Sequence, residues 1–341
     1  MQFDSMTNLL LPVLGFAFAG FVLAMVATPI FTTLAFKYKW WRKQRTQTVT
    51  GEKAKVFAKL HAEKHKRHIP TMAGSIVLIS VAIITLATNM NRAETWLPLA
   101  AMALFGALGL VDDLSNILGF ANRSGGLKAR TQALALISLS AICAWWFYTK
   151  LGYNMMHVPA VGDFSIGWLY IPLFILVVFS TAKSVSITDG LDGLAGGLLS
   201  IAYGSYAIIA FFSGLYALAA FCATIVGAML AYTWFNIYPA RFFMGQVGST
   251  ALGATLGVIA MLTNSVFVLP IIGMVFVLEA GSSAVQIFSK KVLGRKIFRS
   301  APLHHHLEAI GWPETKVTMR LWIIGAIMGC LGLLIGLIAR G

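Results

Sequence analysis

Charged side chains are scarce in this chain. Asp, Glu, Lys and Arg make up 11% of its 341 residues, whereas a soluble globular chain carries roughly 25%. Hydrophobic residues make up 58%, and the mean hydropathy is +0.79. So little polar surface cannot coat a water-soluble body. The composition therefore excludes a soluble enzyme and predicts a protein whose solvent is the bilayer.

Cysteine is rare as well. Cys143, Cys222 and Cys330 each fall in a different apolar stretch. Three thiols so placed form neither a disulfide framework nor a zinc site, so we expect them to be packing residues.

Acidic residues number only 12, and five of them lie inside or at the ends of long apolar stretches. They are Asp112, Asp113, Asp189, Asp192 and Glu279. A charge near hydrocarbon costs several kcal/mol unless it faces a polar cavity or a partner. These five carboxylates are therefore the first candidates for a functional site in a membrane enzyme or transporter.

The apolar stretches predict an all-α polytopic membrane protein with about ten transmembrane helices in a single domain over residues 1–341. A helical span needs about 20 apolar residues. The stretches that meet or approach this length lie near 9–36, 72–90, 96–115, 131–149, 168–186, 193–212, 214–235, 247–263, 266–288 and 319–339. The first is too long for a signal-peptide core and no basic segment precedes it, so we interpret it as a retained span.

The basic residues are unevenly placed between the predicted spans. Of the 26 Lys and Arg residues, 23 fall in the odd-numbered loops. The positive-inside rule then places both termini outside and the odd-numbered loops in the cytoplasm. The net charge of +14 thus indicates topology and contact with membrane lipids, and we expect no nucleic-acid partner. Residues 53–68 are typical of a basic helix lying on the cytoplasmic leaflet, and 152–168 of a short hairpin on the outer side.

The polar clusters all fall on the predicted cytoplasmic side. Asp112 and Asp113 close the third span, and a Thr-Asp-Gly-Leu-Asp-Gly motif at 188–193 follows the fifth. Residues 236–249 join the seventh and eighth spans, and 304–306 are three consecutive histidines. Chance would scatter such groups over both sides of the membrane, so we expect them to build one site.

Each cluster also has a structural interpretation. The adjacent aspartates suit Mg²⁺ or a phosphate, and the alternative, a water-facing cap, is disfavoured because acids oppose the dipole at a helix C-terminus. The two aspartates of the 188–193 motif lie three apart, so a polar turn between helices explains them equally well. Three consecutive imidazoles cannot all face one ligand, and a solvated loop cluster and a phosphate-binding role both stay open for them. Glu279 inside the ninth span is more typical of a structural hydrogen-bonding group.

Taken together and in order, these motifs resemble those of the polyprenyl-phosphate N-acetylhexosamine-1-phosphate transferase superfamily. They are Ile-Pro-Thr-Met-Ala-Gly at 69–74, Gly-Leu-Val-Asp-Asp at 109–113, the 188–193 motif, Asn236, Phe-Met-Gly at 243–245 and Ala-Pro-Leu-His-His-His at 301–306. The resemblance covers essentially the whole chain. Three histidines followed by Gly311-Trp312 and Lys316 favour the phospho-N-acetylmuramoyl-pentapeptide transferase branch.

The resemblance implies a Mg²⁺-dependent enzyme of the bacterial inner (plasma) membrane with a cytoplasmic active site. It implies transfer of phospho-MurNAc-pentapeptide from UDP-MurNAc-pentapeptide to undecaprenyl phosphate, giving lipid I and UMP in peptidoglycan synthesis. A homodimer is expected from the family as well.

Residue roles follow from the same resemblance. The lipid phosphate would be handled by Asp112 and Asp113, one of them as base, and held by Lys128. Asp189, Asp192 and Asn236 would bind the nucleoside, and Phe243 would stack on the uracil. Lys66 and Thr71 would line the nucleotide pocket. His304, His305 and His306 would lie on the pyrophosphate side. The metal position would be formed by Asp112, Asp113 and residue 246.

This chain departs from the family pattern at several of these positions. The family reads Phe-Met-Gly-Asp, with the carboxylate as a magnesium ligand, whereas this chain has Gln246. Asparagines of the family are replaced by Lys183 and Ser186, and Ile69 and Ala73 replace a Thr and a Gly. Because an amide oxygen carries no net charge, we expect weak Mg²⁺ binding and slow turnover unless Gln246 is compensated.

Three alternatives stay open at this point. One is a transferase that uses UDP-GlcNAc, giving a polyprenyl-phosphate-linked GlcNAc-1-phosphate product. Another is a non-catalytic homologue that binds the same ligands, which Gln246 keeps in view. The third is a transporter with a carboxylate proton relay, which is disfavoured because the acids gather at one face and no paired broken-helix repeat is visible.

Overall fold

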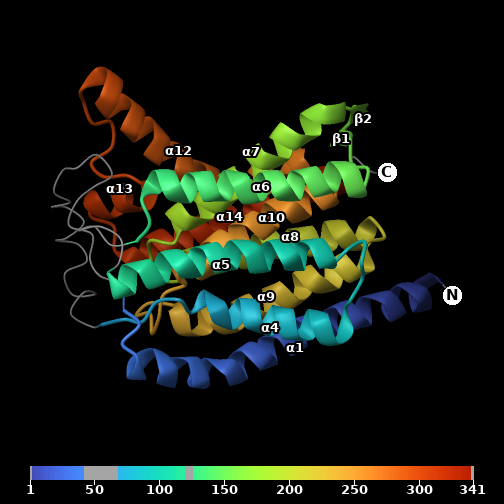
Figure 1. The fold of residues 1–341 in the computed structure, drawn as a ribbon, viewed down its shortest axis with the longest axis horizontal. Coiled ribbons are helices and arrows are strands. Elements are labelled where there is room, and N and C mark those ends of the chain that lie inside the picture. The colour runs from blue at the N-terminus through green and yellow to red at the C-terminus, as the bar shows by residue number, and fades with distance from the viewer. Residues whose placement is uncertain (1, 42–67, 120–125, 339–341) are drawn as a thin grey trace.

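Long apolar helices run side by side through the molecule (Figure 1). The computed structural model describes residues 2–41, 68–119 and 126–338. Its α-helices are α1 (Gln2–Lys37), α4 (Gly74–Thr88), α5 (Trp96–Leu118), α6 (Ala129–Lys150), α7 (Tyr170–Thr188), α8 (Leu194–Phe212), α9 (Tyr216–Asn236), α10 (Gly245–Leu262), α11 (Leu269–Ile272), α12 (Met274–Phe288), α13 (Leu303–Ala309) and α14 (Glu314–Ile338). Short 3₁₀ or π turns join some of them, at η1 (Gly167–Leu169), η2 (Val266–Val268) and η3 (Ser289–Leu293).

The predicted polytopic all-α fold is confirmed. Within the described residues, eight helices are long and apolar enough to cross a bilayer: α1, α5, α6, α7 with η1, α8, α9, α10 and α14. The ninth predicted span is broken, because 266–272 and 274–293 meet at a bend of 80°. The second, α4, has 15 residues, or about 22 Å at 1.5 Å per residue, which is shorter than a hydrocarbon core of about 30 Å. Which side of the membrane each end faces stays a prediction.

Helix α10 lies at the centre of the bundle and packs against α4, α5, α7 and α8. Glycine, alanine and other small residues fill much of its sequence, and small residues let neighbouring backbones approach closely in membrane bundles. All of its residues are buried except Gln246. Solvent therefore reaches this central helix only at its first turn.

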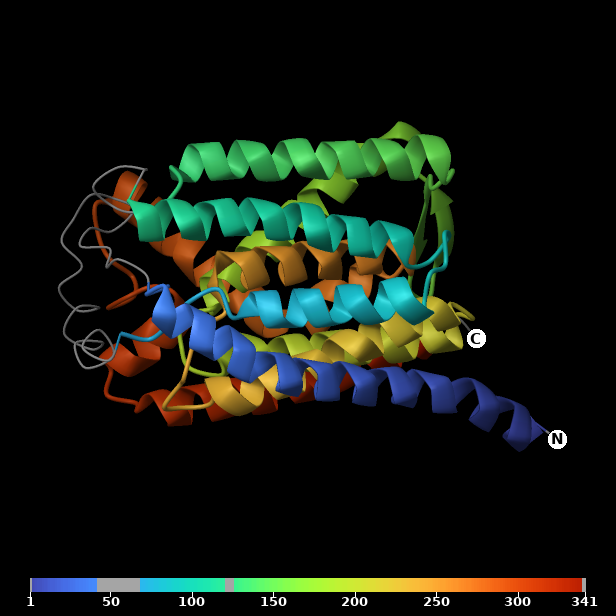
Figure 2. The same ribbon diagram turned by 60° about the horizontal axis from the view of Figure 1, so that its bottom comes forward.

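The two ends of the bundle differ in character (Figures 1 and 2). At one end, Met155–Val158 (β1) and Gly162–Ser165 (β2) form an antiparallel hairpin with Met155 opposite Ser165, as predicted for 152–168. Both chain termini lie toward this end. At the opposite end, α5, α7 and α9 finish and α6, α8 and α10 begin, with α13 beside them. The predicted polar clusters all belong to this second end.

Candidate functional site

The aspartate pair lies within α5 and not at its end. The predicted third span stops at 115, but the helix continues to Leu118, so the pair does not close it. Asp112 is 1% exposed and Asp113 is fully buried, which excludes a water-facing helix cap. Backbone amides from two other segments reach them: Leu127 N donates to Asp112 Oδ1 at 2.6 Å, and Val247 N donates to Asp113 Oδ2 at 3.0 Å.

Two glycines make this meeting of α5 and α10 possible. A Cβ on Gly109 would clash with the backbone carbonyl oxygen of Gln246. Gly245 has φ +76°, and a Cβ there would lie 2.6 Å from Asp113 Oδ2. Only glycine tolerates both the left-handed backbone and such close contact. The Gly-Leu-Val-Asp-Asp and Phe-Met-Gly motifs therefore form one structure.

Lys128 lies at the rim of this structure. It directly follows Leu127, whose N–H binds Asp112. It occupies the N-cap position of α6, and its side chain is exposed. The backbone of Lys128 therefore adjoins the residue that binds Asp112, and its role in holding a phosphate stays a prediction.

Gln246, the predicted metal position, is engaged in a polar network. Its Oε1 accepts from Ser186 Oγ at 3.0 Å, from Thr250 Oγ1 at 3.2 Å and, at 3.4 Å, from Gln132 Nε2. A carbonyl oxygen has two lone pairs, so these three donors occupy it fully. A cation could bind there only by displacing them.

The donor set around Gln246 therefore does not fit Mg²⁺. Magnesium is usually held by one or two carboxylates in strict octahedral geometry, and a saturated neutral amide is a poor substitute for one of them. Among the described residues, no cluster of three or more His, Cys, Asp or Glu side chains offers another set of ligands.

The 188–193 motif forms the turn between α7 and α8. Asp189 caps the C-terminus of α7 and is partly buried, and Asp192 is 2% exposed. Asp192 Oδ2 accepts from Ala240 N at 3.0 Å, and Asp192 N donates to Glu314 Oε1 at 2.7 Å. Asp192 thus fastens this turn to the segment after α9 and to the start of α14.

Asn236 is a second clamp on the same turn. Its Oδ1 accepts from Gly193 N at 3.0 Å and its Nδ2 donates to Phe242 O at 2.8 Å. The side chain is 4% exposed, so both bonds are shielded from water. Asp192 and Asn236 therefore both hold the turn in place, and their contacts with a nucleoside stay a prediction.

Replacing Asn236 by alanine is expected to lower the free energy of unfolding by about 2–4 kcal/mol, because it leaves a buried N–H and a buried C=O without partners. Asn236→Asp keeps the acceptor Oδ1 but places an oxygen against Phe242 O, so it should not restore the stability. Chemical unfolding in detergent measures both, with Asn8→Ala on the exposed face of α1 as the control. Equal stability of Asn236→Ala and the control would contradict the clamp.

The segment around Phe243 is joined to the segment that leads into α4. Phe243 N donates to Pro70 O at 2.8 Å, and Ala73 N donates to Phe243 O at 3.0 Å. Thr71 is 1% exposed, and its N–H donates to Trp40 O at 2.8 Å. The Phe243 side chain is half-buried. Lys66 and almost all of the predicted basic helix at 53–68 lie outside the described residues.

The three histidines lie on α13 and face three different partners. His304 Nδ1 is 2.8 Å from Glu279 Oε2, and His305 Nδ1 is 2.8 Å from Glu308 Oε2. His306 Nδ1 accepts from Arg299 N at 3.2 Å. The prediction that consecutive imidazoles cannot share one ligand is confirmed, and so is the structural hydrogen-bonding role of Glu279.

The buried Glu279–His304 pair connects α12 and α13 to the 188–193 turn. The two side chains are 0% and 1% exposed, and Glu279 Oε2 also accepts from His304 N at 3.3 Å. The other ring nitrogen, Nε2, faces Gly190, where a Cβ would lie 2.4 Å from it. The histidine motif and the Thr-Asp-Gly-Leu-Asp-Gly motif are therefore in direct contact.

Some residues of this end were not identified from the sequence. Gln132 is hydrogen-bonded to Gln246 and Lys183. Glu314 accepts from the backbone N–H of Asp192 in the turn between α7 and α8. Gln132 is a polar residue in a predicted apolar span, and that position is the signal that could have marked it. Glu314 stands in the first turn of α14 and carries no motif.

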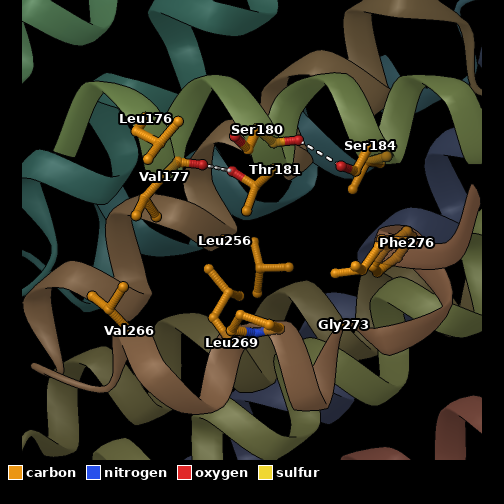
Figure 3. A pocket seen from close by; sticks show the side chains of 13 residues that line it. Leu176, Val177, Ser180, Thr181, Ser184, Leu256, Val266, Leu269, Gly273 and Phe276 are labelled. Carbon is orange, nitrogen blue, oxygen red and sulfur yellow. Dashed lines mark hydrogen bonds between the residues drawn. The ribbon is translucent and has the colours of Figure 1, made fainter. Parts of the chain in front are cut away.

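An apolar cavity of about 170 Å³ lies between α7, α10 and the bent α11–α12 pair (Figure 3). Leu176, Leu256, Leu269 and Phe276 point into it. Two hydroxyls in its wall are bonded to their own helix: Ser184 Oγ donates to Ser180 O at 2.7 Å, and Thr181 Oγ1 donates to Val177 O at 2.9 Å. Because these hydroxyls are satisfied, the cavity presents a hydrocarbon surface. On α7 its lining extends to Val185, the residue before Ser186, which binds Gln246.

Comparison with known proteins agrees with this arrangement. Residues 95–264 match the model of glycosyl transferase family 4. A phospho-N-acetylmuramoyl-pentapeptide-transferase of Chloroflexus aurantiacus is 35% identical over 94% of this chain and 89% of its own length. Proteins of the same name from Geobacillus sp. (strain WCH70) and Desulfotalea psychrophila are 34% and 37% identical, over 93% and 77% of this chain and 95% and 79% of their own lengths. The chain belongs to the phospho-N-acetylmuramoyl-pentapeptide-transferase family.

Proposed function

We propose that this chain transfers phospho-MurNAc-pentapeptide from UDP-MurNAc-pentapeptide to undecaprenyl phosphate, giving lipid I and UMP. The observation that carries the proposal is a buried aspartate pair, bound by the residue before Lys128, together with an apolar cavity that extends along α7 as far as Val185. A lipid phosphate needs a polar site for its phosphate group and an apolar surface for its hydrocarbon tail. The family membership supports the same reaction.

In this reaction a phosphate oxygen of undecaprenyl phosphate attacks the β-phosphorus of the donor. The bond between that phosphorus and the bridging oxygen breaks, and UMP leaves with the bridging oxygen. Such transfers depend on positioning and charge neutralisation more than on protein covalent chemistry. Asp112 or Asp113 accepts the proton of the lipid phosphate, and Lys128 neutralises its charge.

We propose that the donor lies on the adjoining surface. Asp189, Asp192 and Asn236 would contact the nucleoside, Phe243 would stack on the uracil, and Lys66 and Thr71 would line the pocket. The pyrophosphate would lie toward His304, His305 and His306. The direct contact of His304 with Gly190 supports this side-by-side placement of the two motifs.

One part of the isoprenoid tail of the acceptor would occupy the apolar cavity beside α7, whose volume of about 170 Å³ is too small for the whole tail. Burying each CH₂ group there contributes about 0.8 kcal/mol. Ser186 is the next residue of α7 after Val185, which lines the cavity, and is about 1.5 Å further along the helix axis. A tail in the cavity therefore delivers its phosphate to the polar end of the bundle.

Filling the cavity should weaken acceptor binding selectively. Ser180→Phe places a ring in the cavity that Ser180 lines, so we expect a higher KM for undecaprenyl phosphate with unchanged affinity for UDP-MurNAc-pentapeptide. Steady-state kinetics and donor titration measure the two quantities, and Ser180→Ala is the matched control. A rise in the donor dissociation constant instead would place the tail elsewhere.

We further propose that the polar end faces the cytoplasm of a bacterium, with the chain as a multi-pass protein of the inner membrane. The donor is made in water and the acceptor is a lipid, so the site has to lie at a membrane boundary. A homodimer is proposed on the family resemblance alone.

The test is lipid I formation by the purified chain in detergent, with UDP-MurNAc-pentapeptide and undecaprenyl phosphate supplied. The proposal expects a lipid product that requires both substrates. Consumption of UDP-GlcNAc in place of the muramoyl donor would assign the chain to the GlcNAc-1-phosphate branch. If neither donor gave a product, the transferase proposal would be contradicted, and a transporter or a ligand-binding protein without activity would be favoured.

A second candidate is a homologue that binds the same ligands without turnover. The saturated amide at Gln246 favours it, since a carboxylate is missing where the family has one. Tight binding of UDP-MurNAc-pentapeptide without UMP release would support this candidate over the enzyme.

A further inference from the structure

Three departures from the family pattern, which are scattered in the sequence, belong to one hydrogen-bonded network. Gln246 on α10 accepts from Ser186 on α7 at 3.0 Å and from Gln132 on α6 at 3.4 Å. Lys183, one turn before Ser186, donates from Nζ to Gln132 Oε1 at 2.6 Å. The residues at 183, 186 and 246 are therefore linked through Gln132, and a change at one affects the others.

The charge of Lys183 determines which groups in the network donate and which accept hydrogen bonds. Its ammonium group is a donor only, so Gln132 must present Oε1 to it and turn Nε2 toward Gln246. A carboxylate at 246 would accept the same bonds and add a negative charge near the aspartate pair. In this chain a neutral amide stands there and a cation has been added through Lys183.

This cation lies in the same part of the molecule as the aspartate pair. Val247, the neighbour of Gln246, donates its N–H to Asp113 Oδ2 at 3.0 Å, and Gly245 on the other side is packed against the same oxygen. Lys183 and Gln132 are both partly exposed, so a ligand anion has access to them. The site thus holds one more fixed positive charge and lacks one negative charge relative to the family pattern.

We propose that Lys183 supplies in this chain the positive charge that a divalent cation supplies at residue 246 in the family, so that the donor pyrophosphate binds without metal. The inference rests on the proposed function for the identity of the donor. An ammonium group is a compact point charge with three donors and binds phosphates well. The hydrogen bond to Gln132 holds it next to the space that a metal ligand at 246 would face.

The test uses UDP as the probe and the full-length chain in detergent, with binding measured by titration calorimetry. We expect the same affinity in EDTA and in millimolar Mg²⁺. Lys183→Met should weaken UDP binding at least about tenfold, since a hydrogen bond to a charged group contributes about 1.5–3 kcal/mol. Lys183→Arg should keep metal-free binding, and Lys150→Met on the distant end of α6 is the matched control.

The reverse exchange is the second arm. The triple variant Lys183→Asn, Ser186→Asn, Gln246→Asp should bind UDP at least about tenfold more tightly with Mg²⁺ than with EDTA. Thermal unfolding of each variant separates loss of binding from loss of fold. Loss of wild-type UDP binding in EDTA, or unchanged binding by a folded Lys183→Met variant, would overturn the inference. Because UDP binding needs no transfer, failure of lipid I formation alone leaves this result interpretable.

Discussion

Of the variants Asp112→Asn and Asp113→Asn, the one that removes the general base should reduce lipid I formation by at least about a hundredfold. A positioned general base typically contributes 10²–10⁴ in rate, and an amide cannot accept the proton of the lipid phosphate. Both carboxylates are buried and held by backbone N–H groups of other segments, so neither can be replaced by a neighbouring acid. The measurement is the initial rate of lipid I formation at saturating donor and acceptor.

The control for this pair is Asp163→Asn. Asp163 lies in the hairpin at the opposite end of the bundle and pairs with His157 at 2.8 Å, so its loss should leave the rate unchanged. If Asp112→Asn and Asp113→Asn both retained the wild-type rate while folding normally, the aspartate pair would not be the base. Loss confined to one of them would identify which carboxylate takes the proton.

The Glu279–His304 pair is expected to give the largest effect on stability. Glu279→Leu leaves the ring of His304 buried without its partner, and breaking a buried pair in this way typically costs about 3–5 kcal/mol. The turn at 188–193 rests against the same ring through Gly190, so donor binding should fall as well. Chemical unfolding in detergent and titration with UDP measure the two effects.

A double variant tests whether the pair acts as a unit. Replacing both partners, in Glu279→Leu with His304→Leu, removes both buried polar side chains and should be less destabilising than Glu279→Leu alone. His306→Gln, whose ring is only half-buried, is the control with a small expected effect. Additive losses in the double variant would show that the two residues act independently.

The membrane architecture could be predicted from the sequence because hydropathy over long windows is a strong signal. The spans at 96–115 and 214–235 correspond to α5 and α9. The hairpin within 152–168 followed from alternating residues between turn signals. The gathering of the polar motifs at one end of the bundle followed from counting spans, because each motif closes or opens a span on the same side.

Other features depend on contacts that no local pattern contains. The 80° bend before Met274 interrupts a stretch whose hydropathy alone looks continuous. The link from Lys183 through Gln132 to Gln246 joins three helices. The sequence around each glutamine does not indicate which residue it binds. The continuation of α5 to Leu118, beyond the predicted end at 115, was also missed, since the polar pair resembled the end of a span.

The most direct test of the proposed transfer follows the phosphorus atom. UDP-MurNAc-pentapeptide carrying a radioactive β-phosphate is incubated with undecaprenyl phosphate and the purified chain, and the lipid and aqueous phases are separated. The proposed reaction predicts label in the lipid extract, unlabelled UMP in water, and equal amounts of the two products. Label that stays in the aqueous phase, in the donor, in UMP or in free phosphate, would contradict phospho-sugar transfer by this chain.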